Sequence, residues 1–189
     1  MLRGYWHPAP RRTLLGWAKP LLDLMVMDFP DLRERLARVT DAIAHHQSLG
    51  GWSHPVRIVA VTKTHGPAAV REAVAAGIPD VGENRVQEAL AKQEQCEGVP
   101  ARWHLIGSLQ RNKARHAVGR FALIHSVDRL ELATELDRRV LAVNGRQPIL
   151  VEVNCSGEAQ KGGVEPEALA PLLDAIAALP GLELRGLMT

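Results

Sequence analysis

The stretch VRIVAVTKTHG, from Val56 to Gly66, places a lysine at the end of an apolar strand. Its first six residues are rich in β-branched side chains, which predicts a buried strand. Lys63 follows where that strand should end, between two threonines, and His65-Gly66-Pro67 then predicts a turn into a helix. The sequence therefore predicts a strand that presents one lysine at its carboxyl end.

The rest of the chain repeats this alternation of strand and helix. Six short apolar runs are separated by longer runs with helical periodicity, and every strand except the last is followed by a helix. The strands are apolar on both faces, which is typical of a parallel sheet covered by helices. The predicted strands are 56–61, 78–84, 101–108, 121–127, 147–154 and 181–189, and the predicted helices are 31–49, 67–77, 85–96, 111–119, 128–145 and 165–179.

Several residues mark the ends of these helices. Pro67 stands at the start of one helix and Gly77 just past its end, as helix capping predicts. Gly119 is expected to stop the helix over 111–119, and Asp128 is expected to cap the next helix.

Two architectures fit such a sheet, namely an open doubly wound sheet and a (β/α)8 barrel. No GxGxxG motif follows the first strand, so a dinucleotide-binding open sheet has little support. Polar residues instead end many strands, and a barrel gathers such residues around one mouth. The sequence therefore predicts an α/β chain of the TIM-barrel type with these residues at its mouth: Lys63, Glu83, Asn84, Ser108, Ser126, Asp128, Asn154 and Thr189.

The composition is that of an ordinary globular domain. The chain has 189 residues, of which 46% are hydrophobic and 23% charged, and a net charge of +2 requires no nucleic-acid or membrane partner. Cys96 and Cys155 show no CxxC spacing and the histidines no HExxH motif, so neither a disulfide framework nor a metal site is expected. No apolar run reaches the ~20 residues that a membrane-spanning helix needs.

The first 26 residues differ from the remainder. They hold four basic residues and one acidic residue, and they include the single tyrosine, Tyr5. A targeting peptide is one interpretation, although the segment lacks a clean apolar core and a small-residue cleavage site. We interpret residues 1–26 as a disordered leader, or as the result of a start codon placed too early, and residues 27–189 as the folded domain.

Lys63 has two interpretations on the local sequence alone. Most lysines at strand ends extend into solvent with their stems against apolar neighbours. A lysine at a barrel mouth can instead be partly desolvated, which favours the neutral and nucleophilic amine. Two Schiff-base chemistries then stay open, a class I aldolase and a protein that holds pyridoxal phosphate.

Six segments form a pattern together: VAVTKT, GENRVQEA, WHLIGSLQRNK, LIHSVDRLELATELDRR, VEVNCSGEAQKGG and LRGLMT. In order and spacing they resemble the pyridoxal-phosphate homeostasis protein family, the YggS-like or PROSC-like barrel proteins. The resemblance covers about residues 28–189. The six segments together are specific, whereas any one of them alone would be a weak signal.

The resemblance implies both a fold and a cofactor. The fold is the (β/α)8 barrel of fold-type III pyridoxal-phosphate proteins, similar to the N-terminal domain of alanine racemase. The cofactor is pyridoxal 5'-phosphate, held as a Schiff base on Lys63 with Asn84 beside it. His104 and Met188 are further candidates for cofactor contacts, and packing in the core is the alternative for both.

The resemblance also implies a role without catalytic turnover. Such proteins look like carriers or regulators of the free cofactor pool in vitamin B6 homeostasis, so no catalytic residue and no metal ligand is assigned. A pyridoxal-phosphate-dependent racemase is the rival, but those enzymes bring a tyrosine to the site, and Tyr5 lies in the atypical leader. We expect a cytoplasmic protein with a small-molecule partner, no nucleic-acid or membrane partner, and a monomeric state when complete.

Two positions and the end of the chain depart from the family pattern. Ser108 stands where the family usually has histidine, and Gly162 where it usually has serine. The family continues beyond LRGLMT through two more strand–helix units, which supply contacts to the phosphate and an arginine that faces the pyridine nitrogen. We therefore expect about six of eight barrel units, with open edges at the first and sixth strands. Such a chain would retain the cofactor weakly, or be a truncated, non-functional fragment.

Overall fold

The six strands form a single parallel sheet in which they follow one another in chain order. The computed structural model describes residues 29, 31–158 and 162–189. Its strand order is β1-β2-β3-β4-β5-β6, and each neighbouring pair is parallel. Parallel strands in consecutive order are the arrangement of a (β/α) barrel, which confirms the predicted fold class as part of such a barrel. The strands are β1 (Ala60–Val61), β2 (Asp80–Glu83), β3 (Arg102–Leu105), β4 (Leu123–Val127), β5 (Gln147–Glu152) and β6 (Leu182–Met188).

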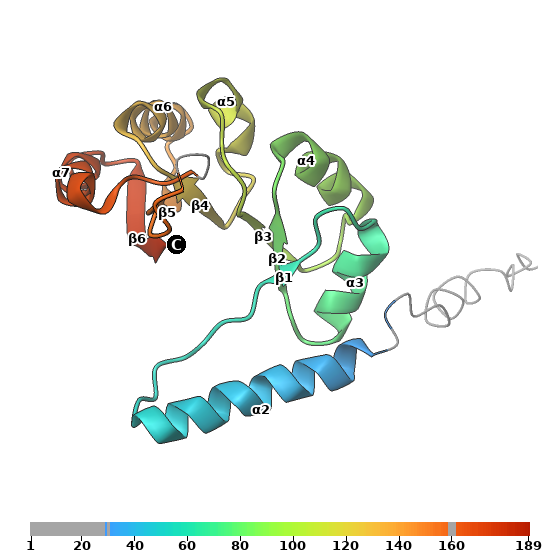
Figure 1. Cartoon of the computed structure of the whole chain (residues 1–189). Helices are drawn as coiled ribbons and strands as arrows, with labels where there is room; N and C mark the ends of the chain where they lie inside the picture. The colour runs from blue at the N-terminus through green and yellow to red at the C-terminus, as the bar shows by residue number, and fades with distance from the viewer. Residues whose placement is uncertain (1–28, 30, 159–161) are drawn as a thin grey trace, which may run out of the picture.

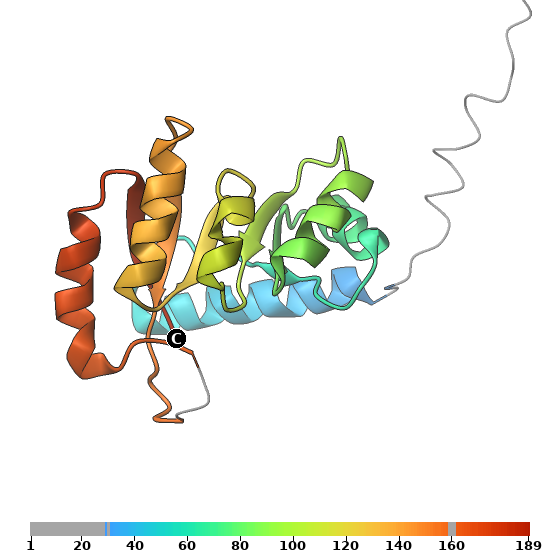
Figure 2. The same cartoon turned by 90° about the horizontal axis from the view of Figure 1, so that it is seen from above.

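The connecting helices lie on one side of this sheet. They are α3 (Pro67–Ala75), α4 (Val86–Gln95), the 3-10 helix η1 (Arg111–Lys113) with α5 (Ala114–Ala117), α6 (Leu130–Leu141) and α7 (Pro166–Ala177). Figures 1 and 2 show α3 to α7 in a row around the curved sheet. The helix before β1, α2 (Leu32–Gly50), lies apart from this row and runs below the sheet in Figure 1.

The core lies between the sheet and this row of helices. Alternate strand residues point toward the helices and are fully buried, among them Val81, Leu105, Ile124 and Ile149. They pack against apolar residues of α4, α6 and α7, of which Leu136 is one example. A smaller cluster under α3 also receives Leu36 of α2, so α2 is joined to the domain by apolar packing at β1 and α3.

The opposite face of the sheet carries apolar residues, such as Val61 and Leu123, but also a buried polar cluster that the prediction of strands apolar on both faces did not include. His104 is paired with Gly82 in the ladder, and Asp80 and His125 bond to His104 from the adjoining strands. A buried polar group is tolerated where it is hydrogen-bonded, and these three side chains form one hydrogen-bonded chain. A single polar residue in an apolar run, such as His104, does not reveal from the sequence which neighbours will form its hydrogen bonds.

Three predicted element boundaries are wrong. The first strand was expected over 56–61 but has two residues, because its ladder with β2 begins only at the pair Ala60–Val81. The helix over 111–119 is divided into η1 and the short α5, after which the extended ψ of Val118 ends the helix. Asp128 is not a helix cap, since α6 begins at Leu130 and the Asp128 carboxylate accepts a hydrogen bond from the Arg129 guanidinium.

The other predicted elements are confirmed, with small differences at their ends. Pro67 begins α3, and Gly77 follows its end with a positive φ of 91°, as the capping residues predict. The leader over 1–26 lies outside the described residues, so its predicted disorder and the domain boundary at residue 27 stay predictions. Within the described residues no helix is long and apolar enough to cross a membrane.

Candidate functional site

Lys63 is exposed and lies two residues after the end of β1, at the carboxyl edge of the sheet. The pair Val61–Gly82 in the β1–β2 ladder puts Lys63 and Asn84 two residues further along neighbouring strands, on the same face. The expected partial desolvation of Lys63 is contradicted, because the lysine is exposed at the end of an edge strand of the described sheet. A free amine is therefore accessible to a ligand at this edge.

The backbone on either side of Lys63 is tightly held. Thr62 is 4% exposed, and its amide donates to the Gly82 carbonyl at 3.0 Å. Its carbonyl accepts hydrogen bonds from the Lys92 amine at 2.8 Å and from the His65 amide at 3.2 Å. On the other side Thr64 has a φ of 66°, which is rare for a β-branched residue and is a local strain.

Glu83 and Lys92 form an ion pair on the helix side of the sheet, below Lys63. The Lys92 Nζ lies 2.5 Å from Glu83 Oε1, and the two side chains are 10% and 0% exposed. The Thr62 hydroxyl donates to the same carboxylate oxygen at 2.6 Å. Glu83 was expected at the mouth, and this is corrected because its carboxylate turns toward α4 and Lys92.

Asn84 is held against the end of β3. A Cβ added at Gly107 would lie 2.4 Å from the Asn84 carbonyl oxygen, so the two backbones touch and only glycine fits. The Ser126 hydroxyl donates to the Gly107 carbonyl at 2.7 Å, which links β4 to the same point. The ends of β2, β3 and β4 are therefore locked to one another, and Asn84 lies at this junction.

His104 is 2% exposed and both of its ring nitrogens are engaged. Nε2 lies 2.8 Å from Asp80 Oδ1, and Nδ1 lies 2.9 Å from His125 Nε2. Asp80 also accepts two hydrogen bonds from Arg102. Burial raises the pKa of Asp80, but the hydrogen bonds from Arg102 and His104 outweigh it and leave that pKa below its usual value.

His125 is the last member of the hydrogen-bonded series Asp80–His104–His125, and its protonation makes the stability of the protein depend on pH. Burial, followed by the charge of His104, lowers its pKa from 6.5 to about 4. In the unfolded chain it takes up a proton near pH 6.5, whereas in the folded chain it does so only near pH 4. The contribution of this histidine to stability is therefore complete above pH 6.5 and is lost as the pH falls toward 4.

We predict that the free energy of unfolding falls between pH 6.5 and pH 4 with a contribution of up to one proton from His125. Asp80 acts in a separate window, because its lowered pKa makes its own contribution disappear only below about 3.9. Urea unfolding curves at pH 7, 5.5 and 4.5 measure the slope, and His125→Gln should flatten it. Parallel pH profiles of the wild type and the variant would contradict the assignment.

Met188 ends β6 and pairs in the ladder with Glu152 of β5. β1 and β6 are the two edges of the described sheet, so four strands lie between Met188 and Lys63 in the sheet order. A hollow of about 400 Å³ adjoins this end of β5 and β6, lined by Glu152, Asn154, Cys155 and Thr189 among others. Burial, followed by the charge of Asp128, raises the pKa of Glu152 above its usual value. The structure brings Lys63 and Asn84 to one edge but does not bring Met188 to them.

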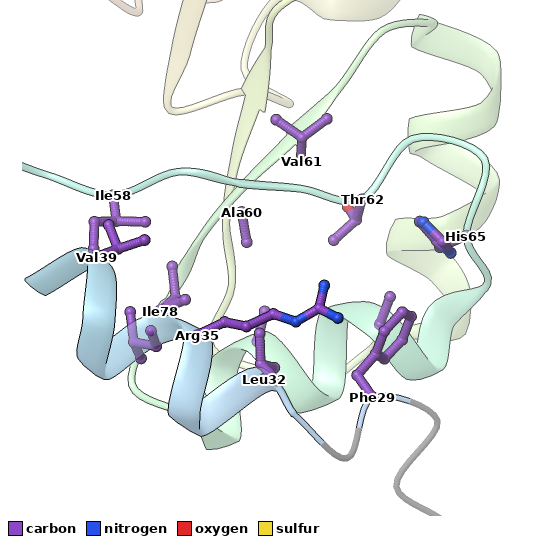
Figure 3. Close-up of a pocket in the computed structure, with 13 residues that line it drawn as sticks. Phe29, Leu32, Arg35, Val39, Ile58, Ala60, Val61, Thr62, His65 and Ile78 are labelled. Atoms are coloured by element: carbon purple, nitrogen blue, oxygen red, sulfur yellow. The ribbon is translucent and has the colours of Figure 1, made fainter.

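A second hollow, of about 290 Å³, lies between α2, β1 and α3 (Figure 3). Its lining is largely apolar, and Arg35, His65 and Thr62 supply its polar atoms. In Figure 3 the side chains of Phe29, Leu32 and Ile78 point into it from α2 and the loops around it. Lys63 is not part of its lining, although Thr62 and His65 on either side of the lysine are.

The sequence reasoning missed the role of Lys92 and the Asp80–His104–His125 chain. A signal for Lys92 existed, because Val86, Ala89, Lys92 and Cys96 follow helical spacing and all four are buried. The chain around His104 left no such signal, since its members are spread over three strands. Among the described residues no group of three or more histidine, cysteine or acidic side chains could hold a metal ion.

A family model for the alanine racemase N-terminal domain matches residues 38–189. The pyridoxal phosphate homeostasis protein of Pseudomonas aeruginosa is 44% identical over 158 residues, which are 83% of this chain and 69% of that protein. The chain belongs to the pyridoxal phosphate homeostasis protein family. The member of this family from Aquifex aeolicus is 41% identical over 157 residues, 82% of this chain and 69% of its own length. The resemblance inferred from the six segments is thereby confirmed.

Solved structures agree with this family and with the fold. PipY of Synechococcus elongatus, solved with pyridoxal phosphate bound, is 40% identical with a TM-score of 0.67, and the match covers 82% of this chain and 68% of PipY. Without the cofactor, PipY gives a TM-score of 0.71. An alanine racemase of Clostridium difficile, in complex with cycloserine, matches with a TM-score of 0.59 at 17% identity, over 71% of this chain and 37% of that enzyme. That likeness shows the shared barrel fold alone.

Proposed function

We propose that the chain binds pyridoxal 5'-phosphate covalently through Lys63 and acts in the homeostasis of this cofactor without catalytic turnover. The observation that carries the proposal is PipY, a relative at 40% identity that was solved with pyridoxal phosphate bound. The names of the curated relatives support the homeostasis role. The geometry agrees, because an accessible lysine stands at the carboxyl edge of a parallel (β/α) sheet, where barrel proteins hold their ligands.

The residues at this edge fit the aldehyde end of such a cofactor. The chemistry that pyridoxal phosphate would supply is an aldehyde carbon that a neutral amine can attack, with water as the leaving group. Lys63 provides the amine, and its flanking backbone is held by Thr62 and strained at Thr64. Asn84 lies at the end of the neighbouring strand, and its side-chain amide can donate a hydrogen bond to the ligand or accept one from it. Its backbone is fixed by the contact with Gly107.

His104 and Met188 enter the proposal as neighbours of the ring, with different geometrical support. His104 has both ring nitrogens engaged, so its role is to fix the floor of the site through Asp80 and His125. Met188 lies on the opposite edge strand and reaches a ligand at Lys63 only where the sheet closes into a barrel. Lys63 and Asn84 are thus the residues for which we propose direct contact.

A racemase is the alternative function, and a catalytic role would need an acid and a base on the two sides of a substrate carbon. Tyr5, the single tyrosine, lies outside the described residues. We propose no catalytic residue and no metal ligand. The cytoplasmic location, the monomeric state, and the absence of nucleic-acid and membrane partners stay predictions from the sequence.

The test is a titration of the purified full-length chain with pyridoxal phosphate, followed by visible absorption. We expect a saturable band that borohydride reduction removes, and a peptide containing Lys63 that carries the added mass. Incubation with L-alanine should then yield no D-alanine. A folded chain that gains no reducible label would refute the proposed binding, and steady production of D-alanine would favour the racemase.

A further inference from the structure

We propose that the buried pair of Glu83 and Lys92 is a positioning device, which fixes Thr62 and thereby sets the direction in which the Lys63 side chain leaves β1. The role in cofactor binding rests on the function proposed above. Neither residue touches the place where a ligand on Lys63 would lie, because both side chains are on the helix side of the sheet. They act through the backbone of the residue before the lysine.

Every polar group of Thr62 is engaged. Its amide donates to Gly82, its hydroxyl donates to Glu83, and its carbonyl accepts from Lys92 at 2.8 Å. Lys92 therefore bridges a strand backbone and a side chain of the neighbouring strand with one ammonium group, which has three donors in all. Hydrogen bonds from a charged donor are the stronger kind, so this bridge holds the end of β1 more firmly than a two-residue ladder could.

The need for such a bridge follows from the shortness of β1. This strand has two residues and, among the residues that the structure describes, pairs only with β2, so its ladder gives little support to the chain beyond Val61. Edge segments with few hydrogen bonds open locally at low free-energy cost. A functional side chain needs a support that holds it close to its working geometry. Lys63 itself is exposed, so this support comes from the hydrogen bonds of Thr62, the residue before it.

Stability alone does not account for the pair. Oε2 of Glu83 is buried and has no hydrogen-bond partner among the described residues. A buried ion pair that leaves one oxygen unsatisfied contributes little net stability, and apolar replacements of both partners are often neutral or stabilising. An arrangement that is costly for stability and directed at the residue before the lysine is what a positioning role predicts.

The experiment separates positioning from stability with the double variant Glu83→Met, Lys92→Met in the full chain. Its midpoint of urea unfolding should equal or exceed that of the wild type. Amide hydrogen exchange in the peptide that contains Thr62 and Lys63 should be at least tenfold faster without any cofactor. The Kd for pyridoxal phosphate, measured by the reducible absorption band, should rise at least tenfold.

Asp137→Asn is the matched control. Asp137 is also a buried carboxylate that accepts a backbone hydrogen bond, from the Gly181 amide at 2.7 Å, but it lies on α6 beside β6. This variant can lower the unfolding midpoint, and it should leave both exchange around Lys63 and the Kd at their wild-type values. A loss of cofactor binding in Asp137→Asn as large as that in the double variant would show a general effect of stability and overturn the proposal.

A second pair of variants decides the question if the double variant does not fold. Thr62→Val removes the hydroxyl bond to Glu83 at equal size, and Thr62→Ser keeps it. We expect faster exchange around Lys63 and a higher Kd in Thr62→Val, with recovery in Thr62→Ser. Wild-type exchange in the double variant, or equal behaviour of the two Thr62 variants, would overturn the proposal. If the wild type takes no label on Lys63, the proposed function fails, and the exchange measurements still decide whether the pair holds this segment.

Discussion

The variant Lys63→Ala is expected to lose all covalent attachment of pyridoxal phosphate, because the chain then has no amine at the end of β1. No reducible absorption band should form there, and the Kd for the cofactor should rise at least tenfold, which is about 1.4 kcal/mol. Lys63 is exposed, so its removal should change the free energy of unfolding by no more than about 0.5 kcal/mol. Visible absorption and borohydride labelling measure the first effect, and urea unfolding measures the second.

Two further substitutions show whether the effect belongs to the amine. Lys63→Arg keeps the positive charge but cannot condense with an aldehyde, so it should behave like Lys63→Ala. Lys113→Ala removes a lysine of η1 and should leave the label in place. If Lys63→Ala still carried a reducible label, mapping of the modified peptide would identify another amine, and the assignment of Lys63 would be wrong.

Sequence patterns predict the order of elements in this protein better than the local supports of its site. The β-branched run before Lys63 and the positions of Pro67 and Gly77 predict a strand, a turn and a helix, and the structure has them. The same run predicts too long a β1. A strand needs a partner, and the pairing of β1 with β2 begins only at Ala60 and Val81. Periodicity describes one segment at a time, whereas strand length depends on two.

The same limit applies to the site. Lys63 and Asn84 could be found because each ends a predicted strand, and parallel strands bring their carboxyl ends to one edge. The direction of the Glu83 side chain could not be predicted, since a residue in a strand faces either the helices or the open face according to the register of that strand. The Asp80–His104–His125 chain joins three strands across 21 to 24 residues of sequence, so only the assembled sheet reveals it.

The tight contact between Gly107 and Asn84 leads to the second large effect. A Cβ at position 107 would meet three backbone atoms of Asn84 at 2.4, 2.7 and 2.9 Å, and backbone cannot rotate away as a side chain can. We expect Gly107→Ala to push the ends of β2 and β3 apart. Overpacking of this kind costs about 1–3 kcal/mol of stability. Because Asn84 moves with the end of β2 and leaves its position relative to Lys63, the Kd for pyridoxal phosphate should also rise at least tenfold.

Gly66→Ala is the control for Gly107→Ala, since Gly66 lies three residues after Lys63 but has open space around an added Cβ. Its φ of −74° suits alanine, and the expected cost is limited to the weaker capping of α3, about 1 kcal/mol or less. Urea unfolding and a cofactor titration on both variants separate two causes. If Gly107→Ala loses stability but binds the cofactor like Gly66→Ala, then Asn84 makes no contribution to binding, and Lys63 acts without it. If both properties fall together only in Gly107→Ala, the packed junction of β2 and β3 is what holds Asn84 in reach of the ligand.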